Sequence, residues 1–155
     1  MFADGAARRV IVSIPDRKAV LLEDGKVTRV FPVAVGKSAT PTPTGTFQIV
    51  TRIPHPTWYG PKVVVAPGKA NPLGTRWIGL SVKGYGIHGT NSPKSIGKAS
   101  SLGCIRMLNR DVEELFEMVR AGDVVELLSE PPEEVAKLLA VPQAVPAMTA
   151  DGGGE

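Results

Sequence analysis

The chain's only cysteine, Cys104, and one of its two histidines, His88, lie in the polar, glycine-punctuated stretch GIHGTNSPKSIGKASSLGCIR. The ordinary pKa of a cysteine thiol is near 8.5, so about 3% of such a thiol is ionised at pH 7. A neighbouring imidazolium lowers that pKa and makes the thiolate abundant. The two residue types together therefore indicate nucleophilic catalysis, with His88 as the base that keeps Cys104 ionised.

The residues beside this pair have properties that acyl transfer needs. Gly103 has no side chain to block a carbonyl substrate, and it adopts turn angles that other residues avoid. The backbone N–H groups of Leu102, Gly103 and Cys104 could bind the oxyanion that forms during attack. The carbonyl of Gly89 could orient the imidazole of His88 in place of the usual acidic residue.

Simpler interpretations of the same residues stay open at this point. A lone cysteine is more often a small buried hydrophobe than a nucleophile, and a lone histidine is usually a structural hydrogen-bonding group. Catalytic pairs are neighbours in space rather than in sequence, so the spacing between His88 and Cys104 decides nothing by itself. The polar setting, which does not suit a core element, favours catalysis.

The composition is typical of one globular domain with a turn-rich β fold. Of 155 residues, 43% are hydrophobic and 21% are charged, which is enough to bury a core. The 17 glycines and 14 prolines argue against a helical bundle. The net charge is only +3 and no basic stripe is interleaved with aromatic residues, so we expect no nucleic-acid partner.

Several kinds of site and targeting segment lack support. A single cysteine excludes an internal disulfide, and His55, His88 and Cys104 show no zinc-ligand spacing, so we expect no metal and no cofactor. His55, between two prolines, is interpreted as a surface residue. No apolar run reaches the ~18–20 residues of a membrane helix. The start, MFADGAARR, lacks the basic-then-apolar order of a signal peptide.

Strand patterns dominate the middle of the chain. Apolar runs bounded by Gly and Pro predict strands over 8–15, 46–52, 62–67, 76–82, 85–89 and 123–128. Residues 18–36 are typical of a hairpin whose turn is Asp24-Gly25, since that pair tolerates positive φ angles.

The helical signals come later in the chain. An apolar stripe predicts a helix over 110–120, with Asn109 as its N-cap; the stripe consists of Val112, Leu115, Phe116 and Val119. A short helix is expected within 129–140 and a flexible tail over 141–155. With an N-terminal segment over 1–9, the main domain spans 10–128. We expect a mainly β sandwich or barrel with one docked α-helix and a short C-terminal helix.

Several separated motifs resemble one known family. IHGT followed by SLGCIRM is similar to the active-site signature of the L,D-transpeptidase (YkuD-like) family. The resemblance continues upstream through FPVAVGKSATPTPTGTF, TWYGP and NPLGTRWIGLS, and downstream into NRDVEELFEMVRAGDVVEL. It covers 10–128, which would be the catalytic domain.

The resemblance implies a cysteine enzyme that acts on the peptide stems of bacterial peptidoglycan. Cys104 would be the nucleophile, His88 the general base and acid, and Gly89 the carbonyl that orients His88. Ser101 and Gly103 match the family's serine and glycine.

For four further positions the resemblance leaves more than one role open. Arg106 matches the arginine after the cysteine, where it would either bind a stem carboxylate or brace the loop. Leu102 stands where many members carry histidine, which puts any substrate contact or proton relay by that side chain in doubt. Trp58 and Tyr59 would form a lid over the stem or simply anchor a packed loop.

The resemblance leaves three functions open. The first is cross-linking through a thioester and an amine acceptor, which would make the enzyme a carbapenem target. The second is an L,D-carboxypeptidase that uses water as acceptor, and the third is a non-catalytic wall-binding module. In each case we expect a monomer in the bacterial cell envelope, the periplasm or the cell wall.

Overall fold

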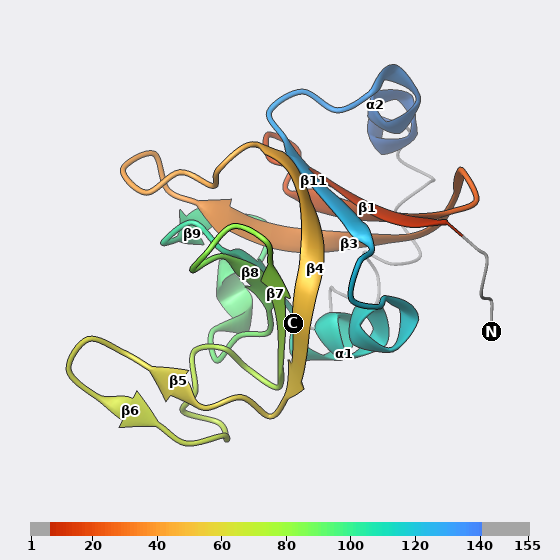
Figure 1. Ribbon diagram of the computed structural model, residues 1–155. Coiled ribbons are helices and arrows are strands. Elements are labelled where there is room, and N and C mark those ends of the chain that lie inside the picture. Colours follow the sequence, from red (N-terminus) through yellow and green to blue (C-terminus); the bar gives the residue numbers. More distant parts are fainter. Residues whose placement is uncertain (1–6, 141–155) are drawn as a thin grey trace.

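The computed structural model describes residues 7–140, and its main feature is a closed barrel of eight strands (Figure 1). These are β1 (Arg8–Ser13), β2 (Lys18–Glu23), β3 (Lys26–Gly36), β4 (Gly45–Pro54), β7 (Arg76–Leu80), β8 (Gly86–His88), β10 (Ile105–Met107) and β11 (Val124–Leu128). They follow one another in the order β10-β8-β7-β4-β11-β1-β2-β3, and β3 pairs with β10 to close the ring. The pairs β1–β11 and β8–β10 are parallel and the others antiparallel, so the barrel is mixed.

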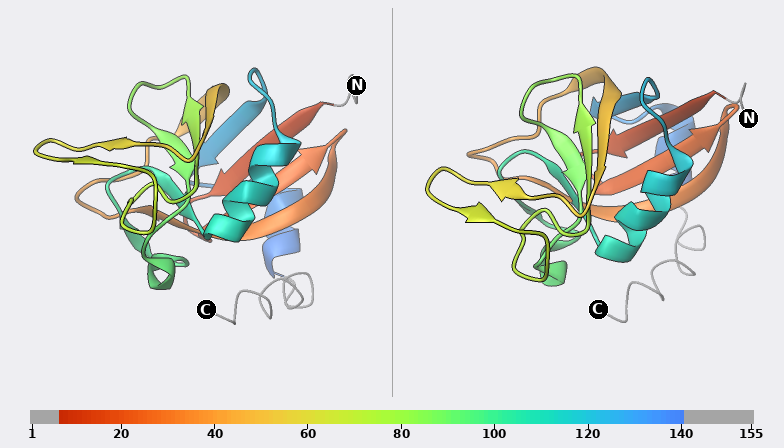
Figure 2. Two further views of the ribbon diagram at one scale, coloured as in Figure 1. Left: turned by 90° about the horizontal axis from the view of Figure 1, so that it is seen from below. Right: turned by 60° about the horizontal axis from the view of Figure 1, so that its bottom comes forward.

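Three shorter strands lie outside the ring. β9 (Ala99–Ser101) adds to β3 in parallel, after a single 3-10 turn, η1 (Pro93–Ser95). β5 (Trp58–Tyr59) and β6 (Val64–Val65) form a separate antiparallel hairpin that extends away from the barrel (Figures 1 and 2). The predicted strand over 62–67 is therefore only two residues long, and β5, β9 and β10 were not predicted.

The hairpin predicted over 18–36 is confirmed as β2 and β3. Asp24 and Gly25 connect the strands with φ angles of 52° and 80°, the positive values that the turn requires.

Two apolar clusters explain why the sequence folds this way. Alternate residues of the barrel strands point inward and form the main core. The other face of β1, β2 and β3 is also buried, around Ile11, Val20 and Val30, because the helix α2 (Glu133–Ala140) covers it with Val135. The short C-terminal helix is thus confirmed, and it buries a second face of the sheet.

The docked helix α1 (Asn109–Met118) contributes Val112, Leu115 and Phe116 to the main core and packs against β7 and β8 (Figure 2). The predicted stripe is confirmed, but the predicted cap is wrong. Leu108 is the N-cap residue and makes no side-chain bond. The helix ends before Arg120, since Val119 is already extended at φ −108° and ψ 164°. The predicted tail over 141–155 lies outside the described residues.

The base of the β5–β6 hairpin is held by the fully buried amide of Asn71. Its Nδ2 donates to the carbonyl oxygens of Pro56, Val65 and Ala66 at 2.9, 3.1 and 3.2 Å. Its Oδ1 accepts the Leu73 N–H at 2.8 Å. One side chain thus joins the segment before β5 to the segment after β6, and it fixes where the hairpin leaves the barrel.

Replacing Asn71 by alanine should therefore weaken the fold at this point. The Asn71→Ala variant leaves buried backbone groups without partners, so its free energy of unfolding should fall by about 1–3 kcal/mol. Asn91→Ala is the matched control, because Asn91 is exposed and makes one 3.2 Å bond to the Ala70 carbonyl. It should change the free energy by less than about 0.5 kcal/mol in denaturant titrations. Equal effects of the two substitutions would contradict the role given to Asn71.

Candidate active site

The strand register places Cys104, His88 and Arg106 on one outer face of the barrel. Side chains alternate between the two faces of a strand, and those of Ile87 and Ile105 belong to the core. His88 and Arg106 are register partners in the parallel β8–β10 pair, one residue beyond Ile87 and Ile105, so they point outward. Cys104 lies two residues before Arg106 and returns to that outer face.

The same outer row continues onto β7 with Trp77, which pairs with His88. The indole stacks on the imidazole with 5.8 Å between ring centroids and 22° between planes. A Cβ at Gly86 would lie 2.7 Å from the Trp77 ring and one at Gly79 would lie 2.9 Å from it, so glycine at both positions leaves room for the indole. Sequence analysis did not single out Trp77, although its strand, RWIGL, was predicted.

The tautomer of His88 follows from its contact with the next residue. Nδ1 lies 2.6 Å from the Gly89 carbonyl oxygen. Since a carbonyl oxygen only accepts hydrogen bonds, Nδ1 must carry the proton. Nε2 of the neutral ring is then unprotonated and is the nitrogen able to accept a proton.

Burial keeps this imidazole neutral. Only 6% of His88 is exposed, and its removal from solvent lowers its pKa to about 4. The Gly89 carbonyl raises the pKa and offsets part of that effect, while the positive charge of Arg106 lowers it further. At pH 7 His88 is therefore an uncharged base.

Cys104 is only partly exposed and lies in the turn between β9 and β10. Burial raises the pKa of its thiol, against smaller lowering effects of a Gly86 backbone hydrogen bond and the charge of Arg106. The thiol donates to the Gly84 carbonyl at 3.8 Å. Burial therefore works against the expected imidazolium–thiolate pair in the free protein, because both groups are withdrawn from the water that would stabilise their charges.

The turn that carries Cys104 is organised by the buried hydroxyl of Ser101. Ser101 Oγ accepts the Gly103 N–H at 3.0 Å and donates to the Cys104 carbonyl at 2.7 Å. Gly103 has φ +124°, and a Cβ there would lie 2.8 Å from the Tyr85 ring, so only glycine fits. The Gly103 N–H was expected to bind the oxyanion. It is already bonded to Ser101 Oγ and is therefore not free for that role. Leu102 is 74% exposed.

Arg106 is the register partner of His88 and follows Cys104 by two residues. Its Nη1 donates to Ser95 Oγ at 3.1 Å, and its buried Nε has no hydrogen-bond partner within residues 7–140. The guanidinium is therefore anchored by a neutral hydroxyl and keeps its charge available to Cys104 and His88.

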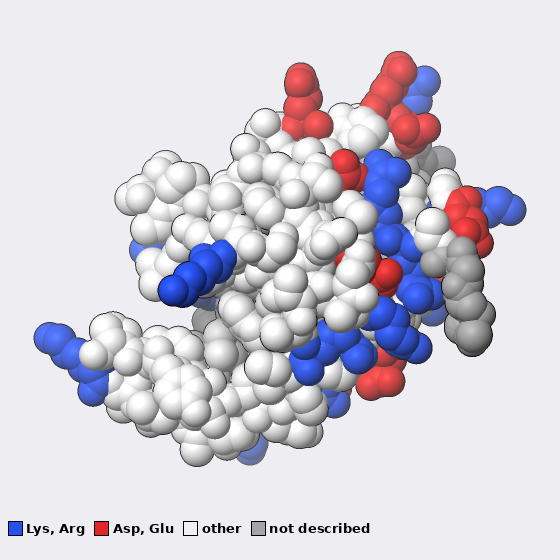
Figure 3. Space-filling view, viewed as in Figure 1, with Lys and Arg blue, Asp and Glu red and all other residues white. Residues whose placement is uncertain are grey.

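A cavity of about 600 Å³ opens beside the sulfur. Cys104 lines it together with Trp58 and Tyr59 of β5 and with Trp77 of β7. His55, predicted as a plain surface residue, is exposed and also lines this cavity. Figure 3 shows few charged side chains on the visible face around the β5–β6 hairpin, whereas charges gather over β1, β3 and α1. A cavity with aromatic walls beside a thiol suits an extended substrate such as a peptide.

Within residues 7–140, no group of three or more His, Cys, Asp or Glu residues could hold a metal ion. None of the helices there is long and apolar enough to span a bilayer.

A family model described as the L,D-transpeptidase catalytic domain, YkuD, matches residues 7–127. The "Putative L,D-transpeptidase YkuD" of Bacillus licheniformis is 45% identical over 119 residues, which cover 77% of this chain and 64% of that protein. The chain thus spans less than two thirds of the length of this relative.

Comparison with solved structures gives the same fold. An L,D-transpeptidase from Mycobacterium smegmatis has a TM-score of 0.68 at 23% identity, covering 79% of this chain and 59% of that chain. The LD transpeptidase LdtMt1 in complex with imipenem has a TM-score of 0.67 at 22% identity, with the same coverage of 79% and 59%. With the family model matched over most of its residues, the chain belongs to the YkuD family of L,D-transpeptidase catalytic domains.

Proposed function

We propose that this domain cuts and rejoins peptide stems of bacterial peptidoglycan through an acyl-enzyme on Cys104. The observation that carries the proposal is the pairing of His88 with Arg106 two residues after Cys104, whose side chain lines an aromatic-walled cavity. The family acts on peptidoglycan, and a stem is an extended peptide of the kind that such a cavity accommodates. We expect the enzyme to work in the cell envelope as a monomer.

In the first step, the sulfur of Cys104 attacks the amide between the L-centre of a diamino acid and the terminal D-Ala of a donor stem. The C–S bond forms while the thiol proton passes to Nε2 of His88, so neither residue needs a charge beforehand. The Gly89 carbonyl then stabilises the new imidazolium through Nδ1. Arg106 favours the sulfur anion at the same moment, since its charge lowers the pKa of the thiol.

The tetrahedral intermediate needs hydrogen-bond donors for its oxyanion. Since the N–H of Gly103 is bonded to Ser101, we assign this role to the N–H of Cys104, with that of Leu102 as the second donor. Collapse breaks the C–N bond, and His88 gives its proton to the departing D-Ala amine. The product is a thioester on Cys104.

In the second step, a side-chain amine of another stem attacks the thioester and forms the cross-linking amide. The amine loses its proton to His88, and Cys104 leaves as a thiol after receiving that proton. The aromatic side chains of Trp58, Tyr59 and Trp77 would hold the stems and keep water from the thioester, which favours an amine acceptor over hydrolysis.

Cys104→Ala should abolish covalent capture of substrate and of β-lactams. The relative LdtMt1 has been solved with imipenem, so wild-type protein should gain the mass of one imipenem in intact-mass spectra, and Cys104→Ala should gain none. Circular dichroism should match between the two proteins, since a partly exposed thiol contributes little to packing. An adduct on the alanine variant would rule out Cys104 as the nucleophile, and an inert wild-type thiol would favour the wall-binding module.

Incubating a tetrapeptide stem with and without a second stem or a D-amino acid identifies the acceptor. We expect a new amide product only when an amine is present, and little free tripeptide. His88→Ala should lower the rate of both steps by about 10²–10⁴-fold, the usual contribution of general acid–base catalysis. Tripeptide as the sole product under both conditions would instead identify an L,D-carboxypeptidase.

The pH dependence of kcat/KM should reflect a neutral His88. The base must be unprotonated, and the pKa of His88 is about 4, so activity should be lost only as the pH falls through about 4. Between about pH 5 and pH 8, kcat/KM measured with a tetrapeptide should stay level. An acid limb near the ordinary histidine pKa of about 6.5 would show that burial does not hold the imidazole neutral.

A further inference from the structure

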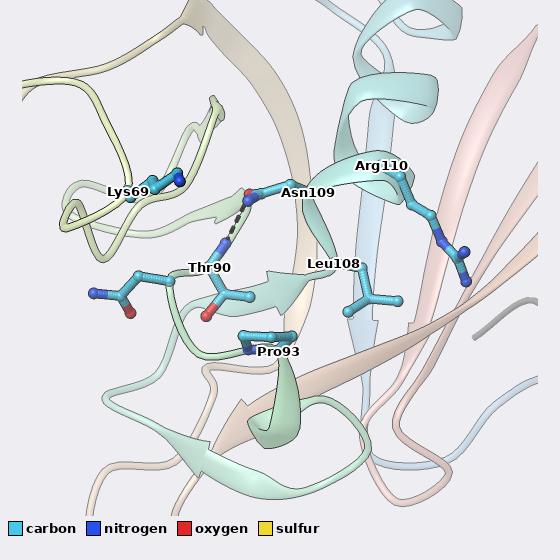
Figure 4. Close-up of a pocket in the computed structure, with 7 residues that line it drawn as sticks. Lys69, Thr90, Pro93, Leu108, Asn109 and Arg110 are labelled. Carbon is cyan, nitrogen blue, oxygen red and sulfur yellow. Dashed lines mark hydrogen bonds between the residues drawn. The ribbon is translucent and has the colours of Figure 1, made fainter. Parts of the chain in front are cut away.

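The side chain of Asn109 turns away from its own helix and bonds to backbone beside the candidate active site. Its Oδ1 accepts the Thr90 N–H at 3.1 Å and the Thr75 N–H at 3.2 Å. Thr75 directly precedes β7, and Thr90 lies two residues after His88, the last residue of β8. Figure 4 shows Asn109 at the start of α1 pointing toward Thr90. The residue predicted as a helix cap instead joins the ends of the two strands that carry Trp77 and His88.

The N–H of Thr90 belongs to the same peptide unit as the carbonyl of Gly89. In a trans peptide the N–H and C=O groups point in opposite directions within one rigid plane, so a partner for one sets the direction of the other. Asn109 holds the N–H side of this plane, and the carbonyl side lies 2.6 Å from Nδ1 of His88. A single peptide plane therefore connects the amide of Asn109 to the imidazole.

The surroundings leave the Asn109 oxygen little freedom to move. A Cβ at Gly89 would lie 2.1 Å from Oδ1 and one at Gly74 would lie 2.2 Å from it, so both glycines make room for this side chain. Thr75 Oγ1 also donates to Glu113 Oε2 at 2.6 Å, which binds the first turns of α1 to the same loop. The helix, two loops and the Gly89 peptide form one connected unit.

We propose that Asn109 is a positioning residue whose Oδ1 orients the Gly89 peptide, and thereby keeps the proton of His88 on Nδ1 and leaves Nε2 free. Asn109 lines two other cavities but does not line the 600 Å³ cavity that contains Cys104, so it touches no reacting atom. The effect of Asn109 on the catalytic rate rests on the proposed function, whereas its effect on the tautomer of His88 does not.

The test compares variants at this position that differ in the oxygen. Asn109→Ala removes the oxygen together with most of the side chain, and Asn109→Leu removes the oxygen but keeps the bulk. Each should lower kcat by about 10²-fold with KM nearly unchanged. Asn109→Asp keeps an oxygen that accepts the same two N–H groups, so it should restore most of the rate. Asn91→Ala is the control, because exposed Asn91 lines the neighbouring cavity and should behave as wild type.

The nitrogen-15 resonances of the histidine rings give a readout that needs no turnover. The chain has two histidines, and a His55→Ala sample assigns the signals. At pH 7, wild type and Asn109→Asp should carry the His88 proton on Nδ1, while Asn109→Ala and Asn109→Leu should shift it toward Nε2. The proposal is overturned if the oxygen-free variants keep the wild-type tautomer, or if Asn109→Asp is as impaired as Asn109→Ala. A wild-type protein inactive on stems would reject the proposed function, and the ring nitrogens would still decide the role of Asn109.

Discussion

The hydrogen bond between His88 Nδ1 and the Gly89 carbonyl is the contact on which the rest of the site depends. A carboxylate in that place would also orient the ring, but its negative charge would favour the imidazolium at rest. A backbone carbonyl is neutral, so it fixes the tautomer without overcoming the burial that holds the pKa of His88 near 4. The consequence is a base that is ready at neutral pH and that becomes charged only when it takes a proton.

The barrel brings the segment of Cys104 and Arg106 beside His88 by strand register rather than by sequence proximity. β8 and β10 are three residues long each, and their parallel pairing brings the chain segment after β9 beside His88. β10 is also paired with β3 on its other side, which fixes its position in the ring. α1 begins two residues after β10, so one continuous segment supplies Cys104, Arg106 and Asn109. The thiol, the cation and the proposed positioning residue thus share one anchored stretch of chain.

Much of this could be predicted from the sequence, and the exceptions have physical reasons. The family, the mainly β fold and the stripe of α1 are confirmed, because glycine-rich motifs and periodicity are local signals. β9 and β10 were missed since three-residue strands are stabilised by pairing to distant strands and leave little local pattern. Asn109 was predicted as a cap because propensity does not reveal the N–H groups of Thr75 and Thr90 that its side chain bonds instead. The burial that works against the predicted ionised pair is a property of the fold, so the sequence pattern of His88 and Cys104 does not reveal it. The catalytic roles themselves stay proposals.

The most direct test of this account is a pH titration of the free protein that follows the ultraviolet absorbance of the thiolate, since Cys104 is the only cysteine. Burial and the uncharged imidazole predict no thiolate at pH 7. The absorbance difference between wild type and Cys104→Ala should rise in a single transition above the ordinary range of thiol pKa values, because burial raises the pKa of Cys104. The same curve should be found for His88→Ala. Thiolate absorbance at neutral pH that disappears in His88→Ala would show a preformed ion pair, and it would contradict the proton transfer that the proposed mechanism places within the attack itself.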